Sequence, residues 1–162
     1  MTERWKVALD NGKIVGVVNI DFKKAFDCVS HVILGLKLQA LGFSGPALEW
    51  LRDYLKERRR YAIVNECESP LNAVNCGIPQ GSFLGPRLFS FYANYLSDQI
   101  NEGELALYAD DTTLFHVGSS ADSVCIALNR ILGDIYTWCR NNRLKTHSGK
   151  SEVMLIARKK LL

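Results

Sequence analysis

The stretch LYADDTTLF, residues 107–115, decides how the fold is interpreted, because two adjacent carboxylates interrupt an otherwise apolar strand pattern. The residues on either side of Asp110 and Asp111 are typical of a buried β-hairpin. Adjacent like charges repel, and burial of an unpaired charge is costly. The pair is therefore either a solvated turn, where Asp is a favoured residue, or a binding site for a divalent cation that neutralises it.

A second apolar strand also ends at an aspartate. The run IVGVVNI, residues 14–20, has the length and β-branched composition of a strand, and Asp21 follows it directly. Two strands of one sheet can bring such carboxylates together even when they are distant in sequence. Mg²⁺ binds one or two carboxylates with substrate phosphates and water, and two ions about 3.5–4 Å apart support phosphoryl transfer. The second aspartate therefore favours a cation site.

The remaining pattern predicts four helices and several short strands. Strands cluster as hairpins rather than in βαβ alternation, which predicts an α+β domain with a mainly antiparallel sheet and helices packed on one face. The predicted strands are 14–20, about 61–65 and 73–78, a hairpin at about 104–117, and a final hairpin of 144–146 with 152–157. The predicted helices are one begun by Ser30 and closed by Gly42, one begun at Ser44–Pro46, one from Pro86 to about Ile100, and one capped by Ser119 or Ser120.

Composition is that of one globular domain, with 162 residues, 48% of them hydrophobic, and a net charge of +3. This mild basicity does not by itself indicate nucleic acid. No apolar run is long enough to span a membrane, and the polar N-terminus is not a secretory signal. We therefore expect an intracellular protein, nuclear or cytoplasmic, with no membrane partner. Five scattered cysteines predict reduced thiols rather than a zinc site, although Cys67 and Cys76 could face each other across a hairpin.

Two further segments each have two interpretations. The Gly- and Pro-rich GIPQGSFLGP, residues 77–86, can approach a ligand closely, and Gln80 offers both a donor and an acceptor. An ordinary strand-to-helix connection would have the same composition. The basic run Arg58–Arg60 is either a solvated helix end or a phosphate contact, and the former is favoured.

Taken together, NIDFKKAFD (19–27), GIPQGSFLGPRLF (77–89) and YADDT (108–112) resemble the ordered motifs of reverse transcriptases, above all the non-LTR (LINE-type) retrotransposon branch. The resemblance covers about residues 5–158. It implies a polymerase palm with a ferredoxin-like (RRM-like) core and RNA-directed DNA polymerase activity. It also implies two Mg²⁺ ions, which Mn²⁺ can replace. In this chemistry a primer 3′-hydroxyl attacks the α-phosphate of a deoxynucleoside triphosphate.

The resemblance assigns the metal and proton-transfer roles. Asp21, Asp110 and Asp111 match the metal-binding, catalytic aspartates of the family. The backbone carbonyl of Phe22 matches an additional metal ligand. Lys150 matches a lysine that protonates the departing pyrophosphate, whereas without the family it would be an exposed turn lysine.

The resemblance also assigns the substrate contacts. Phe26 matches the aromatic residue under the sugar of the incoming nucleotide, although a Phe just after a strand is more commonly a core residue. Gln80 and Gly81 match the loop that contacts the nucleotide and the template. Tyr108 matches the aromatic residue near the primer terminus.

The partners implied are an RNA template, a DNA primer and dNTPs. We expect residues 1–162 to form a single palm domain and a fragment of a longer polymerase, because fingers and thumb regions have no room in this sequence. Full-length relatives are also expected to carry an endonuclease domain, and the isolated chain to have little or no activity. One alternative is a truncated, non-catalytic retrotransposon remnant that keeps the palm fold as a nucleic-acid-binding module. Another is a different two-metal enzyme, such as a nucleotidyl cyclase, which the GIPQG loop disfavours.

Overall fold

The structure, a computed structural model, describes residues 2–158. The chain divides into two compact units. The first contains the residues up to Lys23 together with those from Ala93 onward, and the second contains Lys24–Tyr92. The second unit is thus an insertion within the sequence of the first, and the expectation of a single domain stays a prediction.

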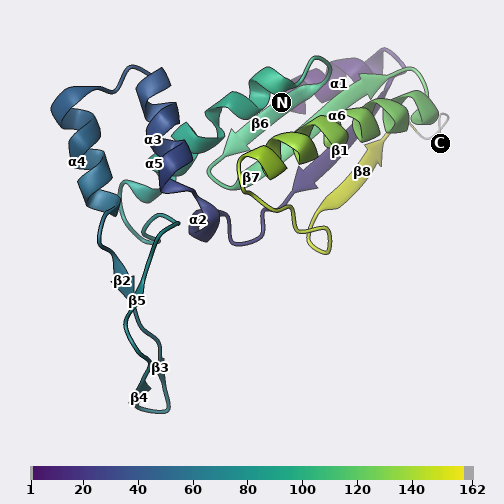
Figure 1. The fold of residues 1–162 in the computed structure, drawn as a ribbon. Coiled ribbons are helices and arrows are strands. Elements are labelled where there is room, and N and C mark those ends of the chain that lie inside the picture. Colours follow the sequence, from purple (N-terminus) through teal and green to yellow (C-terminus); the bar gives the residue numbers. More distant parts are fainter. Residues whose placement is uncertain (1, 159–162) are drawn as a thin grey trace. The chain divides into compact units, whose positions relative to one another are not determined.

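A four-stranded antiparallel sheet forms the centre of the first unit (Figure 1). The central strand β1 is paired along both edges, with β7 on one side and β8 on the other. The α+β class, the first strand and the 104–117 hairpin are therefore confirmed. In spatial order the strands are β6 (Glu104–Tyr108), β7 (Asp111–Gly118), β1 (Ile14–Ile20) and β8 (Glu152–Ile156).

The long helix α6 (Ala121–Asn141) covers one face of this sheet. It begins at Ser120, as predicted, and the side chains of Ser120 and Ser123 form a reciprocal capping box with each other's backbone N–H groups. Its buried stripe faces β1 and β7, while its other faces are exposed. Within residues 2–158, no helix combines the length and the apolar character that crossing a bilayer requires.

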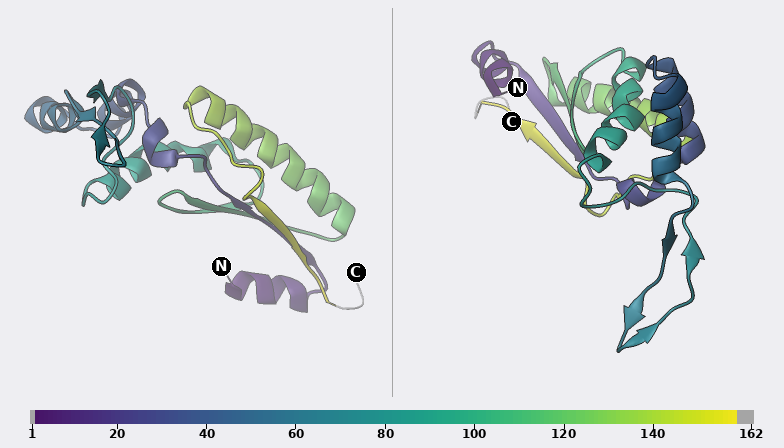
Figure 2. Two further views of the ribbon diagram at one scale, coloured as in Figure 1. Left: turned by 90° about the horizontal axis from the view of Figure 1, so that it is seen from below. Right: turned by 90° about the vertical axis from the view of Figure 1, so that its left-hand side faces the viewer.

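A helix that the sequence analysis did not anticipate, α1 (Thr2–Asp10), packs on the opposite face of the sheet. Figure 2 shows α1 and α6 on either side of the strands. Trp5 meets Phe115 edge to face, with ring centroids 5.7 Å apart, over a small core that includes Val15 and Val17. Only the part of this face near the start of β1 is covered by α1, and the part near Asn19 is not in that core.

The prediction of a final hairpin between 144–146 and 152–157 is wrong. The segment 144–146 and the strand β8 do not pair with each other, because both lie beside β1 or its continuation. Thr146 forms an antiparallel bridge with Phe22, and β8 pairs with β1 from Val15 opposite Ile156 to Asn19 opposite Glu152. Pairing with the buried central strand gives β8 backbone partners along one side and leaves Leu155 and Ile156 half-buried, which a short isolated hairpin would not do.

Four α-helices lie in the second unit, and the ends of α3 follow the predicted signals. The side chain of Ser30 accepts a hydrogen bond from the Ile33 N–H group at the start of α3, and Gly42 follows its end with φ at +92°. The helix predicted from Pro86 to about Ile100 is an α-helix that continues as a 3-10 helix. The helices are α2 (Ala25–Cys28), α3 (His31–Ala40), α4 (Gly45–Leu55) and α5 (Gly85–Ala93), and the 3-10 helix η1 (Asn94–Gln99) belongs to the first unit.

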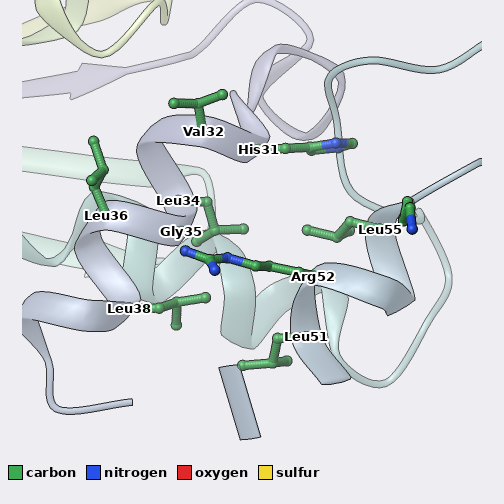
Figure 3. Close-up of a pocket in the computed structure, with 10 residues that line it drawn as sticks. His31, Val32, Leu34, Gly35, Leu36, Leu38, Leu51, Arg52 and Leu55 are labelled. Carbon is green, nitrogen blue, oxygen red and sulfur yellow. The ribbon is translucent and has the colours of Figure 1, made fainter. Parts of the chain in front are cut away.

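A hollow of about 400 Å³ lies between α3 and α4 (Figure 3). Leu34, Leu38 and Leu51 contribute to its apolar lining. A Cβ atom at Gly35 would lie 3.7 Å from the Arg52 Nε atom. A Cβ atom here would thus make only ordinary van der Waals contact with the arginine side chain of α4.

An exposed two-stranded ribbon connects α4 to the Gly/Pro-rich loop. Its turn lies at Asn65 and Glu66, which both have positive φ, so it comes earlier than the sequence analysis expected. Val64 pairs with Cys67, and Cys76 instead forms a bridge with Ser30. The two cysteines therefore do not face each other, and both are free thiols. The ribbon comprises β2 (Arg59–Arg60), β3 (Ile63–Val64), β4 (Cys67–Glu68) and β5 (Asn72–Ala73).

Substitution of Gly16 tests the packing of α6 on β1. A Cβ atom at Gly16 would lie 2.4 Å from Val124 Cγ1, and a valine in a helix has little rotamer freedom to move away. We expect Gly16→Ala to lower the free energy of unfolding by about 1–3 kcal/mol in urea denaturation followed by circular dichroism. Gly133→Ala, where nothing lies within 4 Å of the new atom, should raise it by about 0.5–1 kcal/mol. Equal effects in the two variants would contradict this packing.

Thiol labelling tests the same helix independently. Burial raises the pKa of the Cys139 thiol to about 11, so at pH 8 only about one molecule in a thousand carries the reactive thiolate. We expect iodoacetamide to label the exposed Cys125 in the folded chain and Cys139 only after unfolding, measured by peptide mass spectrometry. Native labelling of both at one rate would be inconsistent with the buried face of α6.

Candidate active site

The three aspartates lie at one end of the sheet, on adjacent strands. Asp21 follows β1 directly, and Asp110 forms the β6–β7 turn with Ala109, whose φ is +52°. Asp111 is the first residue of β7. Ile20 is opposite Thr112, so the same register continued by one residue sets Asp21 opposite Asp111. The carboxylates of the two strands thus lie at the same end of the sheet, as the sequence predicted.

The carboxylates differ in exposure and do not form a closed cage. Asp21 and Asp110 are half-buried, and Asp111 is exposed. Across residues 2–158, no group of three or more His, Cys, Asp or Glu side chains is arranged to hold a metal ion. The chemistry of the donors nevertheless suits a hard cation such as Mg²⁺, because all three side chains offer carboxylate oxygens. Their role as metal ligands stays a prediction.

The backbone around Asp21 is held by the segment that precedes β8. The Asp21 carbonyl accepts a hydrogen bond from the His147 N–H group at 2.8 Å, and its own N–H group donates to Ser151 Oγ at 3.3 Å. Lys150 lies between these two anchors, and its N–H group donates to the His147 carbonyl at 3.0 Å. The sequence-predicted lysine therefore belongs to the turn that fixes Asp21. Ser151 is a site residue that the sequence did not predict, because a single serine in a turn carries no distinguishing signal.

The other two predicted residues of this unit have different surroundings. Phe22 is buried and forms an antiparallel bridge with Thr146. The hydrogen bonds of this bridge run from the Lys23 N–H group to the Lys145 carbonyl and from the His147 N–H group to the Asp21 carbonyl. Tyr108 is 83% exposed and pairs with Asp111 across the hairpin. Directly paired residues share a face, so the tyrosine ring is available on the same face as the Asp111 carboxylate. The carbonyl-ligand role of Phe22 and the primer contact of Tyr108 stay predictions.

Phe26, Gln80 and Gly81 belong to the second unit. Phe26 is half-buried and stacks on the buried Phe89, with ring centroids 5.3 Å apart and an interplanar angle of 11°. It therefore makes the core contact that its sequence context also allowed. Gln80 Nε2 donates to Asp27 Oδ1 at 3.4 Å. The substrate contacts expected of these residues stay predictions.

The glycines of the loop 77–86 each meet a specific backbone requirement. Gly77 and Gly81 have φ of +88° and +75°. A Cβ atom at Gly85 would lie only 2.6 Å from the Pro79 carbonyl oxygen, so the chain can close here only with glycine. Ser82 Oγ supports the same turn by donating to the Pro79 carbonyl at 2.8 Å and accepting from the Gly85 N–H group at 3.0 Å. The loop is thus a defined structure that presents Gln80 and Gly81 at its exposed tip.

Comparison with known proteins places this arrangement in a family. The sequence profile described as "Reverse transcriptase (RNA-dependent DNA polymerase)" matches residues 2–161. The chain belongs to the reverse transcriptase family. Its resemblance to the non-LTR retrotransposon branch is confirmed by the similar relatives, which come from mobile elements of insects.

Two relatives illustrate the similarity. The "Probable RNA-directed DNA polymerase from transposon BS" of Drosophila melanogaster is 31% identical over 93% of this chain and 17% of its own length. The "RNA-directed DNA polymerase from mobile element jockey" of Drosophila funebris is 29% identical over 88% of this chain and 16% of its own. This reverse transcriptase chain thus spans about one sixth of the length of these relatives.

Solved structures with the same fold include telomerases. Telomerase from Candida tropicalis, in complex with a fragment of telomeric RNA, matches 97% of this chain and 29% of its own, with a TM-score of 0.66 and 10% identity. The apo form of telomerase from the same organism has a TM-score of 0.64 over 98% of this chain and 32% of its own. At this identity the similarity shows the fold alone.

Two adjacent threonines beside the aspartates provide a matched pair of substitutions. Thr112 is 2% exposed, and within the described chain its hydroxyl has no hydrogen-bond partner, whereas the Thr113 hydroxyl donates to Asn19 Oδ1 at 3.0 Å. We expect Thr112→Val to raise the free energy of unfolding by about 1 kcal/mol, because it removes a buried unsatisfied group. Thr113→Val should lower it by about 0.5–1.5 kcal/mol. Urea denaturation measures both, and a loss of stability in Thr112→Val would mean that its hydroxyl is satisfied.

Proposed function

We propose that this chain carries the catalytic carboxylates of an RNA-directed DNA polymerase and transfers a nucleotide from a dNTP to a primer 3′-hydroxyl. The observation that supports this most strongly is the position of Asp21 and Asp110–Asp111 at one end of the neighbouring strands β1 and β7. Membership of the reverse transcriptase family agrees with it.

The proposed metal ligands are Asp21, Asp110 and Asp111, with the Phe22 carbonyl as an additional ligand. Divalent ions, Mg²⁺ or Mn²⁺, would supply positive charge that lowers the pKa of the primer hydroxyl and offsets the charge that develops on the phosphates. Carboxylates at two strand ends suit this task, because Mg²⁺ completes its octahedron with substrate oxygens and water. The protein itself contributes the fixed position of Asp21, which two backbone hydrogen bonds maintain.

The other assignments follow the same proposal. Lys150, in the turn that holds Asp21, would donate a proton to the leaving pyrophosphate. Tyr108, exposed beside Asp111, would contact the primer terminus. Phe26, Gln80 and Gly81 would contact the incoming nucleotide and the template strand. An RNA template, a DNA primer and dNTPs are the proposed partners, with the remaining polymerase regions in a longer protein.

Metal titration tests the proposed carboxylate site. We expect Asp110→Asn to weaken Mn²⁺ binding, measured by electron paramagnetic resonance in the presence of dNTP, by about tenfold or more. Asp98→Asn, an exposed aspartate in η1, is the matched control and should bind Mn²⁺ like the wild type. Indistinguishable titrations for all three proteins would rule out the site.

Primer extension on an RNA template tests the reaction itself. The same Asp110→Asn change should reduce incorporation by about 100-fold or more in a longer protein that contains this chain. Metal binding that depends on Asp110 without any template-directed synthesis in the longer protein would instead identify a non-catalytic palm that binds nucleic acid.

A further inference from the structure

A basic hollow lies where α6 ends, in the first unit and outside the carboxylate site. It has a volume of about 520 Å³. Arg140, Arg143 and Lys145 line it together with Tyr136, and its lining within the described chain includes no carboxylate. Nothing in the polymerase chemistry proposed above uses these four side chains.

Arg140 and Arg143 differ from the other described arginines of the same unit in having no acidic partner among residues 2–158, and Lys145 has none there either. Arg4, Arg130 and Arg158 each form an ion pair with a carboxylate. None of the ion pairs recorded within residues 2–158 involves a cation of the hollow. Three unpaired cations around one cavity repel one another, so an anion bound among them would relieve that repulsion.

The backbone of Arg143 supplies an independent observation. Its φ is +55°, in the left-handed region where a helix normally ends on glycine. A non-glycine side chain is disfavoured there, and such outliers concentrate at functional sites. A helix C-terminus attracts cations, but that attraction requires neither a left-handed arginine nor a hollow beside it. Arg143 therefore places a cation where the backbone alone would favour glycine.

The C-terminal end of α6 repels an anion less strongly than an uncapped helix C-terminus would. The Trp138 carbonyl accepts from Asn142 Nδ2 at 2.8 Å, and the Cys139 carbonyl accepts from the Leu144 N–H group at 2.9 Å. Two of the exposed dipoles that would repel a phosphate are thus already hydrogen-bonded.

Tyr136 gives the hollow an aromatic component. It lies one turn before Arg140 on α6 and is 62% exposed. Cations that follow a phosphate backbone, next to an exposed aromatic ring on which a base can stack, are the features with which proteins hold single-stranded nucleic acid. We propose that this hollow binds a single-stranded segment of nucleic acid, with Arg140, Arg143 and Lys145 at phosphates and Tyr136 against a base.

The hollow is connected to the proposed catalytic end through the backbone. The Lys145 carbonyl accepts a hydrogen bond from the Lys23 N–H group at 2.7 Å, two residues beyond Asp21. A strand bound here would therefore lie beside the segment that carries the first carboxylate. The inference rests on the proposed function for its biological meaning, but strand binding itself requires no metal and no catalysis.

Substitution of Arg143 by glycine separates binding from folding. Arg143→Gly removes a cation and also relieves the left-handed backbone, so the variant should unfold at the same or higher urea concentration than the wild type. We expect its affinity for a short labelled polyuridine strand, measured by fluorescence anisotropy in EDTA, to fall about threefold or more. The slope of log affinity against log salt should decrease by about 0.7, the value for one lost phosphate contact. Tyr136→Ala should weaken binding by about fivefold or more.

Arg130→Gln is the matched control, because Arg130 lies on the same helix but is paired with Glu102. It should leave the affinity unchanged. Wild-type affinity in Arg143→Gly, or no binding by the wild-type chain, would overturn the proposal. Displacement of the strand by inorganic pyrophosphate, together with wild-type affinity in Tyr136→Ala, would also overturn it in favour of a small phosphate ligand. Asp110→Asn should bind the strand normally in EDTA, so failure of this proposal and failure of the carboxylate site are distinguishable.

Discussion

The antiparallel pairing of β1 with β7 determines where the side chains of the first unit lie. Opposite residues in such a ladder share a face, so the pairing of Val17 with Phe115 also places Asn19 and, by continuation, Asp21 on the α1 side. A slip of one residue would turn each of them to the α6 side. Apolar packing at one end of β1 therefore fixes the carboxylates at the other.

Opposite charges gather at this end of the first unit from different parts of the sequence. The carboxylates come from two strand ends, and the cations come from the end of α6 and the segment that follows it. Hydrogen bonds from Lys23 to Lys145 and from His147 to Asp21 tie that segment to the end of β1. The same segment therefore positions the first aspartate and supplies basic side chains near it, an arrangement suited to a polyanion held with divalent cations.

The sequence predicted correctly those helices and loops whose signals lie within a few residues of one another. The caps at Ser30 and Ser120, the apolar period of α6 and the glycines of the loop 77–86 all act within a few residues. The helix α1 was missed because its apolar residues Trp5, Ala8 and Leu9 become partly buried only against a core that includes Phe115 of a distant strand. The partner of β8 was missed for a similar reason, since no local feature distinguishes a hairpin from pairing with β1.

Of the two candidate sites, the sequence predicted the carboxylates but not the basic hollow. The position of the three aspartates followed from apolar runs that end in a carboxylate, which is a property of the sequence. The basic hollow could not be predicted, because it depends on the left-handed backbone of Arg143 and on the fold that brings Lys145 beside it. Arginine and lysine residues at and just after the end of a helix carry no sequence signal for a left-handed backbone or for a hollow.

The insertion of the second unit within the first has a consequence for biosynthesis. β1 is made before the inserted unit, whereas β7 and β8, its partners on both sides, are made only after all of Lys24–Tyr92. Until then the central strand is an apolar segment with two unpaired edges, the kind of segment that chaperones bind and that aggregates when left exposed. The inserted unit is fully synthesised in that interval, and the pairing of β7 and β8 with β1 is a late, long-range step.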